Sequence, residues 1–219
     1  MADVPTTKSP AVSKPSAPAT IWNVPNQLTV ARLILSVICF VFLAFDGYLA
    51  ALILFAIAAG TDWVDGYWAR KYGQITQLGR ILDPFADKII ICGTFIFLAA
   101  VPLTSGGSSS GIAAWMAVVV IGREILVTAL RSFFEEHGTD FSANWPGKLK
   151  MVFQCLAVFV SLWRLWNYGY DSSPPAMWTT QPPAWTAWLL HSAVWAAVIM
   201  TVYSGWVYVQ SALRLLRKP

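Results

Sequence analysis

Six runs of mostly apolar residues occupy most of this chain, at approximately 27–45, 48–70, 82–102, 112–133, 147–167 and 185–212. A helix needs roughly 20 such residues to cross the hydrocarbon core of a bilayer. Hydrophobic residues make up 57% of the sequence and charged residues only 12%, whereas an ordinary soluble domain is about 25% charged. The sequence therefore predicts an all-α, polytopic membrane protein with six transmembrane helices.

The basic residues between these runs indicate how the chain is oriented. Residues 104–111 carry no charge, and residues 171–184, which are rich in proline, carry only Asp171. The other connections and the helix ends beside them hold Arg70, Lys71, Arg80, Arg131, Lys148 and Lys150, and the C-terminal tail adds Arg214, Arg217 and Lys218. Because cytoplasmic loops carry an excess of Lys and Arg, we expect both termini to be cytoplasmic.

Residues 1–20 differ from the rest of the chain and are rich in Pro, Ser, Thr and Ala. This composition predicts a disordered tail, followed by one membrane domain at 21–219. The tail has no apolar segment of the kind that a cleavable signal peptide needs, so we expect the protein in the bacterial cytoplasmic membrane. A nucleic-acid partner is excluded, because the chain has no solvated basic domain.

Charged residues inside the apolar runs are costly and usually functional. With the orientation given above, nearly all of them fall in the cytoplasmic half: Arg32, Asp62, Asp65, Asp83, Asp87, Lys88, Arg123 and Glu124. Scattered structural ion pairs would have no reason to gather at one level. We therefore expect one polar cavity that opens to the cytoplasm.

Four of these residues are aspartates with helical spacing. Asp62 and Asp65 are three residues apart, and Asp83 and Asp87 are four apart, so each pair shares a helix face. Four carboxylates in one place of low dielectric repel each other unless cations lie between them. Oxygen ligands without His or Cys favour hard ions, Mg²⁺ or Mn²⁺. Two such ions can clamp a diphosphate and stabilise the attacking and leaving oxygens.

The aspartates form part of a longer motif. The run Asp62-Trp63-Val64-Asp65-Gly66-Tyr67-Trp68-Ala69-Arg70 is followed, after eight residues, by Gly79, Asp83 and Asp87. This run resembles the signature of the CDP-alcohol phosphatidyltransferase family, Asp-x-x-Asp-Gly-x-x-Ala-Arg, eight residues, Gly-x-x-x-Asp-x-x-x-Asp, at all eight fixed positions. The resemblance implies a six-helix fold, a two-metal site, and a CDP-linked lipid donor that releases CMP.

The same resemblance implies a role for each motif residue. Asp62, Asp65, Asp83 and Asp87 would bind the metals, and Asp87 would also be the general base. Gly66, Ala69 and Gly79 would line the cytidine pocket, and Arg70 would support the diphosphate or orient an aspartate. From the residues alone, close helix packing explains the small residues equally well, and Arg70 is also compatible with a snorkelling interfacial cation.

Further segments resemble those members of the family whose acceptor is glycerol 3-phosphate. They are Asn23-Val24-Pro25-Asn26-Gln27-Leu28-Thr29-Val30-Ala31-Arg32, Gly122-Arg123-Glu124 with Arg131, and Gly147-Lys148-Leu149-Lys150. Met151 departs from the Thr that commonly follows. The resemblance implies transfer of a phosphatidyl group from CDP-diacylglycerol to glycerol 3-phosphate, and a homodimer. The sixth apolar run contributes nothing specific to it.

The acceptor assignment also has a physical argument. Glycerol 3-phosphate is an anion, and four cations lie on the cytoplasmic side as candidate ligands for its phosphate: Arg123, Arg131, Lys148 and Lys150. Asn26, Thr29 and Arg32 lie at the interface, where they would contact the nucleotide or the diphosphate. Alternatively, Asn26, Thr29 and Arg32 cap the helix or snorkel, Arg123 and Glu124 form a structural pair, and the other three cations are positive-inside anchors.

Two rival functions stay open at this point. The first is an enzyme of the same family with inositol, inositol phosphate, serine or phosphatidylglycerol as the acceptor. The second is a divalent-cation transporter that uses the aspartates as its transport site. A transporter needs polar residues along the outer half of its helices, and the first three apolar runs have almost none there.

Overall fold

The computed structural model describes residues 24–72, 77–101, 110–136, 145–168 and 183–216 of the chain. These residues form six helices and no strand. The helices are α1 (Val24–Ala44), α2 (Tyr48–Tyr72), α3 (Gln77–Ala100), α4 (Ala114–Glu136), α5 (Trp145–Tyr168) and α6 (Ala184–Leu216). The tail predicted at 1–20 and residues 171–182 of the Pro-rich segment lie outside the described residues.

Each helix coincides with one of the apolar runs, and the turn between α1 and α2 shows why the chain breaks where it does. Asp46 adopts a left-handed conformation with φ of 58°, which Asp tolerates better than most residues. The Gly47 amide donates to the Phe42 carbonyl at 2.8 Å, and the Asp46 amide donates to Leu43 at 3.4 Å. These two bonds form a Schellman motif, which ends α1 by satisfying its last carbonyls.

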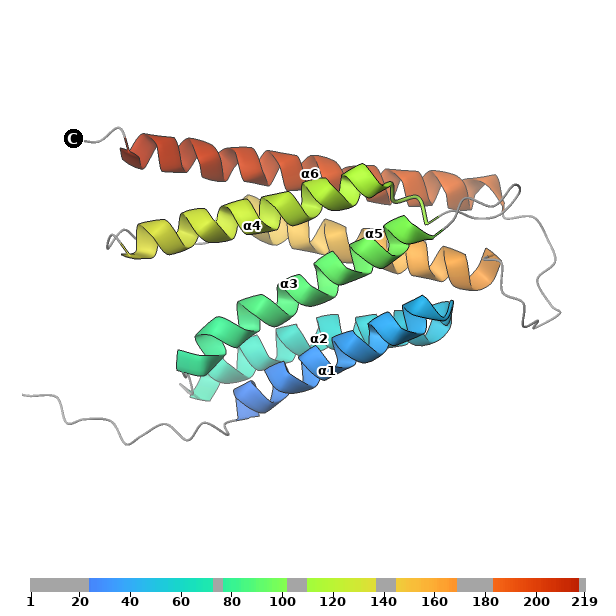
Figure 1. Ribbon diagram of the computed structural model, residues 1–219, viewed down its shortest axis with the longest axis horizontal. Helices are drawn as coiled ribbons and strands as arrows, with labels where there is room; N and C mark the ends of the chain where they lie inside the picture. Colours follow the sequence, from blue (N-terminus) through green and yellow to red (C-terminus); the bar gives the residue numbers. More distant parts are fainter. Residues whose placement is uncertain (1–23, 73–76, 102–109, 137–144, 169–182, 217–219) are drawn as a thin grey trace, which may run out of the picture.

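The bundle has two groups of three helices (Figure 1). In the first group, α1 packs extensively against both α2 and α3. In the second, α6 packs against both α5 and α4. Contacts of α2 and α3 with α5, and of α3 with α4, join the groups. Within the described residues α4 and α5 do not pack directly on each other.

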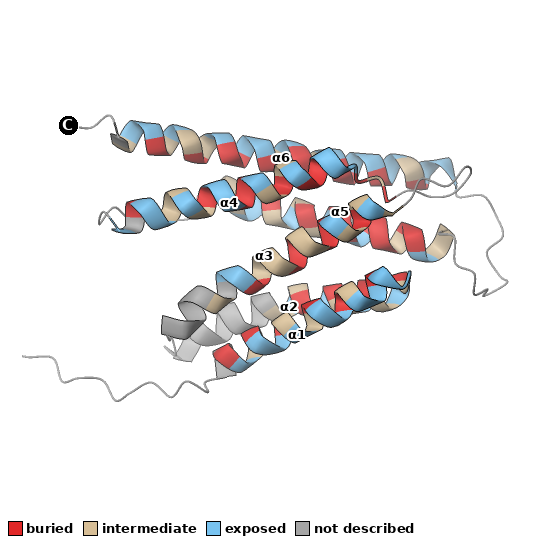
Figure 2. Ribbon diagram, viewed as in Figure 1, coloured by how far each residue is buried: buried red, intermediate tan, exposed pale blue. Residues whose placement is uncertain are grey.

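The distribution of apolar side chains is that of a membrane protein. A buried core includes Cys39, Ala51, Phe95 and Leu98. Exposed positions run along all six helices (Figure 2), and many of them carry large apolar side chains. Trp188, for example, is 77% exposed. Three described segments are long and apolar enough to cross a membrane: Asn26–Ala44, Trp145–Tyr168 and Ala184–Leu215.

Ser110 and Gly111, just before the fourth apolar run, contact three helices: α3, α5 and α6. The Ser110 hydroxyl donates to the Leu98 carbonyl of α3 at 2.5 Å, and the Ser161 hydroxyl of α5 donates to the Ser110 carbonyl at 2.8 Å. Gly111 follows with φ of +72°, and a Cβ atom there would lie 2.7 Å from Cγ and Cδ2 of Leu190 on α6. Only glycine fits both this backbone conformation and this close approach.

Replacing Gly111 with alanine should therefore destabilise the fold. The strained backbone and the clash with Leu190 act in the same direction, and together we expect them to cost about 2 kcal/mol or more. Thermal unfolding of purified protein in detergent measures the change. Gly60→Ala is the matched control, because a Cβ atom there meets nothing within 4 Å. An equal melting temperature for the two variants would contradict the packing at Gly111.

Candidate active site

The first polar contact in the bundle joins α1 to α3. The Arg32 guanidinium donates to Oδ1 of Asp87 at 2.7 Å. The Arg32 side chain is only 1% exposed, so it does not extend to the membrane surface, whereas Asp87 is 28% exposed. Charge-assisted hydrogen bonds of this length are strong. The pair therefore fixes the orientation of the Asp87 carboxylate.

Asn26 and Thr29 extend the polar face of α1 on which Arg32 lies. The three side chains are buried, and their spacing of three residues keeps them on one side of the helix. Asn26 and Thr29 lie inside α1, which begins at Val24, so neither is at the position of an N-cap. Asn26 and Thr29 therefore lie on the side of α1 from which Arg32 reaches Asp87 of α3.

The bounds of α2 and α3 indicate at which height along the bundle the other motif residues lie. Asp62 lies ten residues before the end of α2, and Asp87 lies ten residues after the start of α3. Because the helices run in opposite directions and the rise is about 1.5 Å per residue, these two positions lie at a similar level. Asp65 lies seven residues before the end of α2 and Asp83 six residues after the start of α3, so these two also lie at a similar level.

The side chains of most motif residues lie outside the described part of the structure. These are Asp62, Asp65, Gly66, Ala69 and Arg70 in α2, and Gly79 and Asp83 in α3. Among the side chains that are described, no group of three His, Cys, Asp or Glu residues could hold a metal ion. The four-aspartate site therefore stays a prediction.

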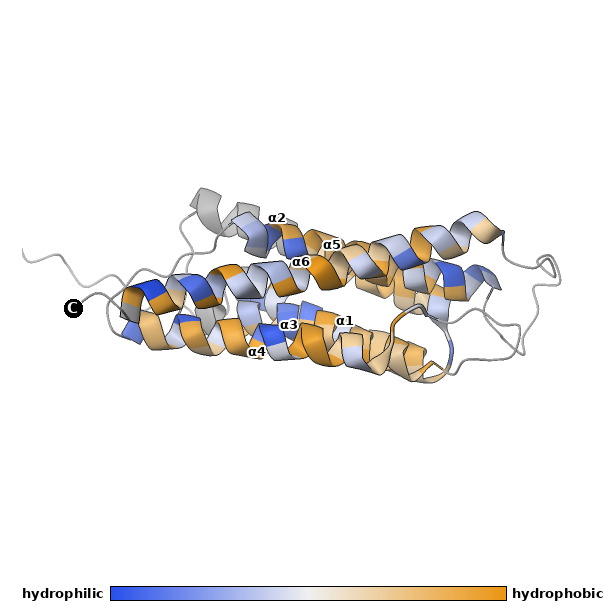
Figure 3. Cartoon of the chain, turned by 90° about the horizontal axis from the view of Figure 1, so that it is seen from above, coloured by the Kyte–Doolittle hydropathy of each residue, from blue (hydrophilic) through white to orange (hydrophobic). Residues whose placement is uncertain are grey.

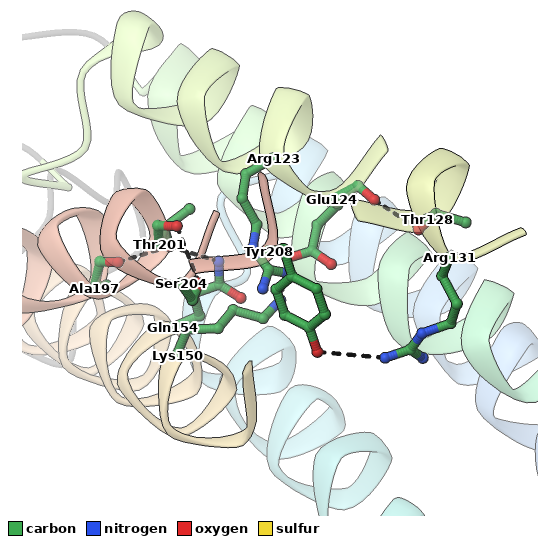
Figure 4. Close-up of polar contacts among 10 residues, drawn as sticks. All are labelled: Arg123, Glu124, Thr128, Arg131, Lys150, Gln154, Ala197, Thr201, Ser204 and Tyr208. Atoms are coloured by element: carbon green, nitrogen blue, oxygen red, sulfur yellow. Dashed lines mark hydrogen bonds and ion pairs between the residues drawn. The ribbon is translucent and has the colours of Figure 1, made fainter. Parts of the chain in front are cut away.

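A second polar cluster joins α4, α5 and α6 and is centred on Glu124 (Figure 4). The Lys150 ammonium of α5 forms an ion pair with Oε1 of Glu124. The Arg123 guanidinium contacts the same oxygen at 3.4 Å. All three side chains are at most 10% exposed. Although α4 and α5 do not pack directly on each other, these side chains connect them.

Arg131, two turns after Glu124 on α4, is linked to the same cluster through α6. Its guanidinium donates a long hydrogen bond of 3.5 Å to the Tyr208 hydroxyl. Lys148, the fourth predicted phosphate ligand, has an exposed side chain on α5. The structure thus gathers three of the four predicted cations, Arg123, Arg131 and Lys150, around Glu124 and Tyr208.

The composition of this cluster favours binding of an anion. The cluster holds three cations and one carboxylate: Arg123 and Lys150 contact Glu124, whereas Arg131 contacts Tyr208. Like charges near each other are unfavourable without a counter-charge. In addition, the Nε atoms of Arg123 and Arg131 are buried and make no hydrogen bond to any group that the structure describes. Buried donors are normally satisfied, so a bound anion with several acceptor oxygens would suit this place. In Figure 3, polar colouring interrupts the apolar surface in the middle of α4.

Sequence reasoning missed the contribution of α6. Tyr208, Thr201 and Ser204 are buried there, and the Gln154 amide of α5 donates to the Thr201 hydroxyl at 3.0 Å. The available signal was the spacing of residues 201, 204, 205 and 208, which places small and polar residues on one face of an otherwise apolar helix. A polar stripe on a membrane helix indicates contact with other polar groups.

Comparison with known proteins identifies relatives over nearly the whole chain. A family described as CDP-alcohol phosphatidyltransferase matches residues 22–203. A Bacillus subtilis protein named CDP-diacylglycerol–glycerol-3-phosphate 3-phosphatidyltransferase is 36% identical over 203 residues, which cover 86% of this chain and 94% of the relative. Proteins of the same name from Haemophilus influenzae and Escherichia coli are 37% and 32% identical, covering 67% and 87% of this chain and 79% and 95% of their own lengths.

Neutralising Glu124 should destabilise the bundle, because it leaves buried cations without their carboxylate. We expect Glu124→Gln to cost about 3–5 kcal/mol, the usual effect of removing one partner of a buried pair. Thermal unfolding in detergent measures it. The double variant Glu124→Gln/Lys150→Met should lose less than the sum of the two single changes, whereas strictly additive losses would contradict the pairing.

Lys148→Met is the matched control for Lys150→Met. Lys148 is the same residue type on the same helix, but its side chain is exposed, so its replacement should change stability by less than about 0.5 kcal/mol. A loss as large as that of Lys150→Met would argue against the burial of Lys150.

Proposed function

The chain belongs to the CDP-alcohol phosphatidyltransferase family, and on this premise we propose that it transfers the phosphatidyl group of CDP-diacylglycerol to glycerol 3-phosphate. The products are phosphatidylglycerophosphate and CMP, as in anionic phospholipid biosynthesis. The names of the relatives given above describe this reaction. One observation in the structure supports the acceptor: the predominantly cationic cluster of Arg123 and Lys150, which are buried, and Arg131, which is half-buried.

The donor diphosphate is proposed to lie between α2 and α3, at the level of the four aspartates. Asp62, Asp65, Asp83 and Asp87 offer only carboxylate oxygens, which suit Mg²⁺ or Mn²⁺. Two such ions, when bound, would neutralise the diphosphate and the developing charge on the leaving CMP. Gly66, Ala69 and Gly79 would leave room for the cytidine and its phosphates, and Arg70 would contact the diphosphate. Asn26, Thr29 and Arg32 would border the same space from α1.

Asp87 is proposed as the general base of the transfer. Its carboxylate is oriented by Arg32 at 2.7 Å and is partly exposed, so an acceptor hydroxyl can reach it. In the reaction the hydroxyl oxygen of glycerol 3-phosphate forms a bond to the phosphorus next to diacylglycerol, and the bond from that phosphorus to CMP breaks. The hydroxyl proton passes to Asp87. Arg123, Arg131 and Lys150 would hold the acceptor's phosphate, with Lys148 at the exposed edge.

The lipid chains need a path from this site into the bilayer. A shallow apolar groove lies between α1 and α3, next to the Arg32–Asp87 pair. Its lining residues are Thr29, Val30, Leu33, Leu82, Phe85 and Ala86. Val30 and Phe85 are 40% and 51% exposed, so the groove faces the lipid. We propose that an acyl chain of the donor leaves the site here.

We further propose that all six helices span the membrane, with both termini and the active site on the cytoplasmic side. The positive-inside distribution supports this orientation. Residues 21–219 would then form one membrane domain, preceded by the tail at 1–20, in the cytoplasmic membrane of a bacterium. Membership of the family also leads us to expect a homodimer.

The reaction predicts metal-dependent release of CMP by the purified protein. With CDP-diacylglycerol and Mg²⁺ or Mn²⁺ in detergent, we expect release with glycerol 3-phosphate and not with glycerol, inositol, inositol phosphate, serine or phosphatidylglycerol. Asp87→Asn should lower the rate by at least about 10²-fold, the usual contribution of a general base. Chelation of the metal should abolish release.

The outcomes separate the rival functions. Release with another acceptor would keep the transferase mechanism and replace the substrate. No release with any acceptor, combined with metal flux in liposomes, would support a transporter. Full activity of Asp87→Asn would remove Asp87 as the base.

The proposed orientation predicts the side of each loop. A phosphatase reporter that is active only outside the cytoplasm should be active when fused after residue 107 or 175, and inactive after residue 74 or 140. The uncharged and Pro-rich loops then lie outside, and the basic connections inside. Reporter activity after residue 74 would reverse the orientation and would exclude a cytoplasmic site.

A further inference from the structure

Tyr208 of α6 contacts both arginines of the cationic cluster. Its side chain is buried, at 2% exposed. Its hydroxyl accepts the 3.5 Å hydrogen bond from Arg131, and its ring centroid lies 5.4 Å from Cζ of Arg123. That distance is within the range of a cation–π interaction. Figure 4 shows the tyrosine ring between the two side chains, which lie about two turns apart on α4.

The backbone around this tyrosine is shaped to let it approach. A Cβ atom at Gly147, at the start of α5, would lie 3.1 Å from the Tyr208 hydroxyl. A Cβ atom at Gly205, one turn before Tyr208, would lie 3.2 Å from Cγ of Arg123. Both distances are tighter than ordinary van der Waals contact. Arg123 is therefore confined between the backbone of α6 and the ring of Tyr208.

The two arginines still have hydrogen-bonding capacity. Arg123 is 9% exposed, and its buried Nε makes no hydrogen bond to a described group, as is true of the Nε of Arg131. The Arg123 guanidinium also contacts the carboxylate of Glu124, the next residue of α4, at 3.4 Å. Without the ring of Tyr208, Glu124 would be the only described side chain that holds the Arg123 guanidinium. Without its hydroxyl, Arg131 would lose its hydrogen bond to α6.

We propose that Tyr208 is a positioning residue for the acceptor site. Its ring and its hydroxyl hold the guanidinium groups of Arg123 and Arg131 in the orientation in which both donate to one phosphate group of the acceptor. This inference rests on the proposed function, because it takes glycerol 3-phosphate as the anion. If so, α6 contributes to acceptor binding, and the missing side chain at Gly147 leaves space for the Tyr208 hydroxyl.

The test separates the ring from the hydroxyl. Tyr208→Leu removes both contacts, whereas Tyr208→Phe keeps the ring and removes the hydroxyl together with its bond to Arg131. We expect Tyr208→Leu to raise the KM for glycerol 3-phosphate about tenfold or more, corresponding to the loss of a desolvated cation–π contact. Tyr208→Phe should recover most of this affinity, with a KM about two- to fivefold above the original. The KM for CDP-diacylglycerol should change by less than about twofold in both, since the donor site is separate.

Tyr203→Leu is the matched control, because Tyr203 is on the same helix but is 53% exposed. It should leave both KM values unchanged. Should Tyr208→Leu not purify as folded protein, Tyr208→Phe alone decides, and an unchanged KM for glycerol 3-phosphate would then overturn the proposal.

Other outcomes distinguish this inference from the proposed function. No activity of the unaltered protein with glycerol 3-phosphate would overturn both. Activity of the unaltered protein, together with an unchanged acceptor KM in Tyr208→Leu, would overturn only the role of Tyr208. A parallel rise of both KM values, without recovery in Tyr208→Phe, would show a purely structural residue and would also overturn it.

Discussion

The arrangement of the second helix group depends on the ion pairs that the Glu124 carboxylate makes. It is buried with Arg123 on its own helix and with Lys150 on α5, and within the described residues α4 and α5 have no direct backbone packing to hold them together. Burying these charges costs solvation energy that a simple apolar contact would not. Their presence is understandable if the excess positive charge serves an anionic substrate.

In the first helix group, α1 to α3, the described buried cation is paired with one carboxylate. There Arg32 is balanced by Asp87, so that a single cation orients a single carboxylate at 2.7 Å. Helix α3 carries Asp87 and packs against both α1 and α4, the helix of Glu124. The carboxylates proposed to bind metal and the positively charged cluster thus adjoin one helix, which suits a reaction between a diphosphate and an anionic acceptor.

Much of this architecture could be predicted from the sequence, because apolar runs of membrane length leave the chain few alternatives. The turn at Asp46 and Gly47 was equally visible, since both residues favour left-handed or tight conformations. The pairing of Lys150 with Glu124 was not, because it connects helices whose relative rotation no local pattern specifies. Tyr208 was missed for a related reason: one tyrosine among many aromatic residues resembles an interfacial side chain until its neighbours are known.

The most extensive contacts join helices that follow one another in the chain, α1 with α2 and α5 with α6. Contacts of short sequence separation form early, because little loop entropy opposes them. Each pair can therefore form as a helical hairpin before more distant helices meet. The ion pairs with partners in different hairpins, such as Arg32 of α1 with Asp87 of α3 and Glu124 of α4 with Lys150 of α5, can close only once both helices are present, so the polar interior is assembled after the hairpins.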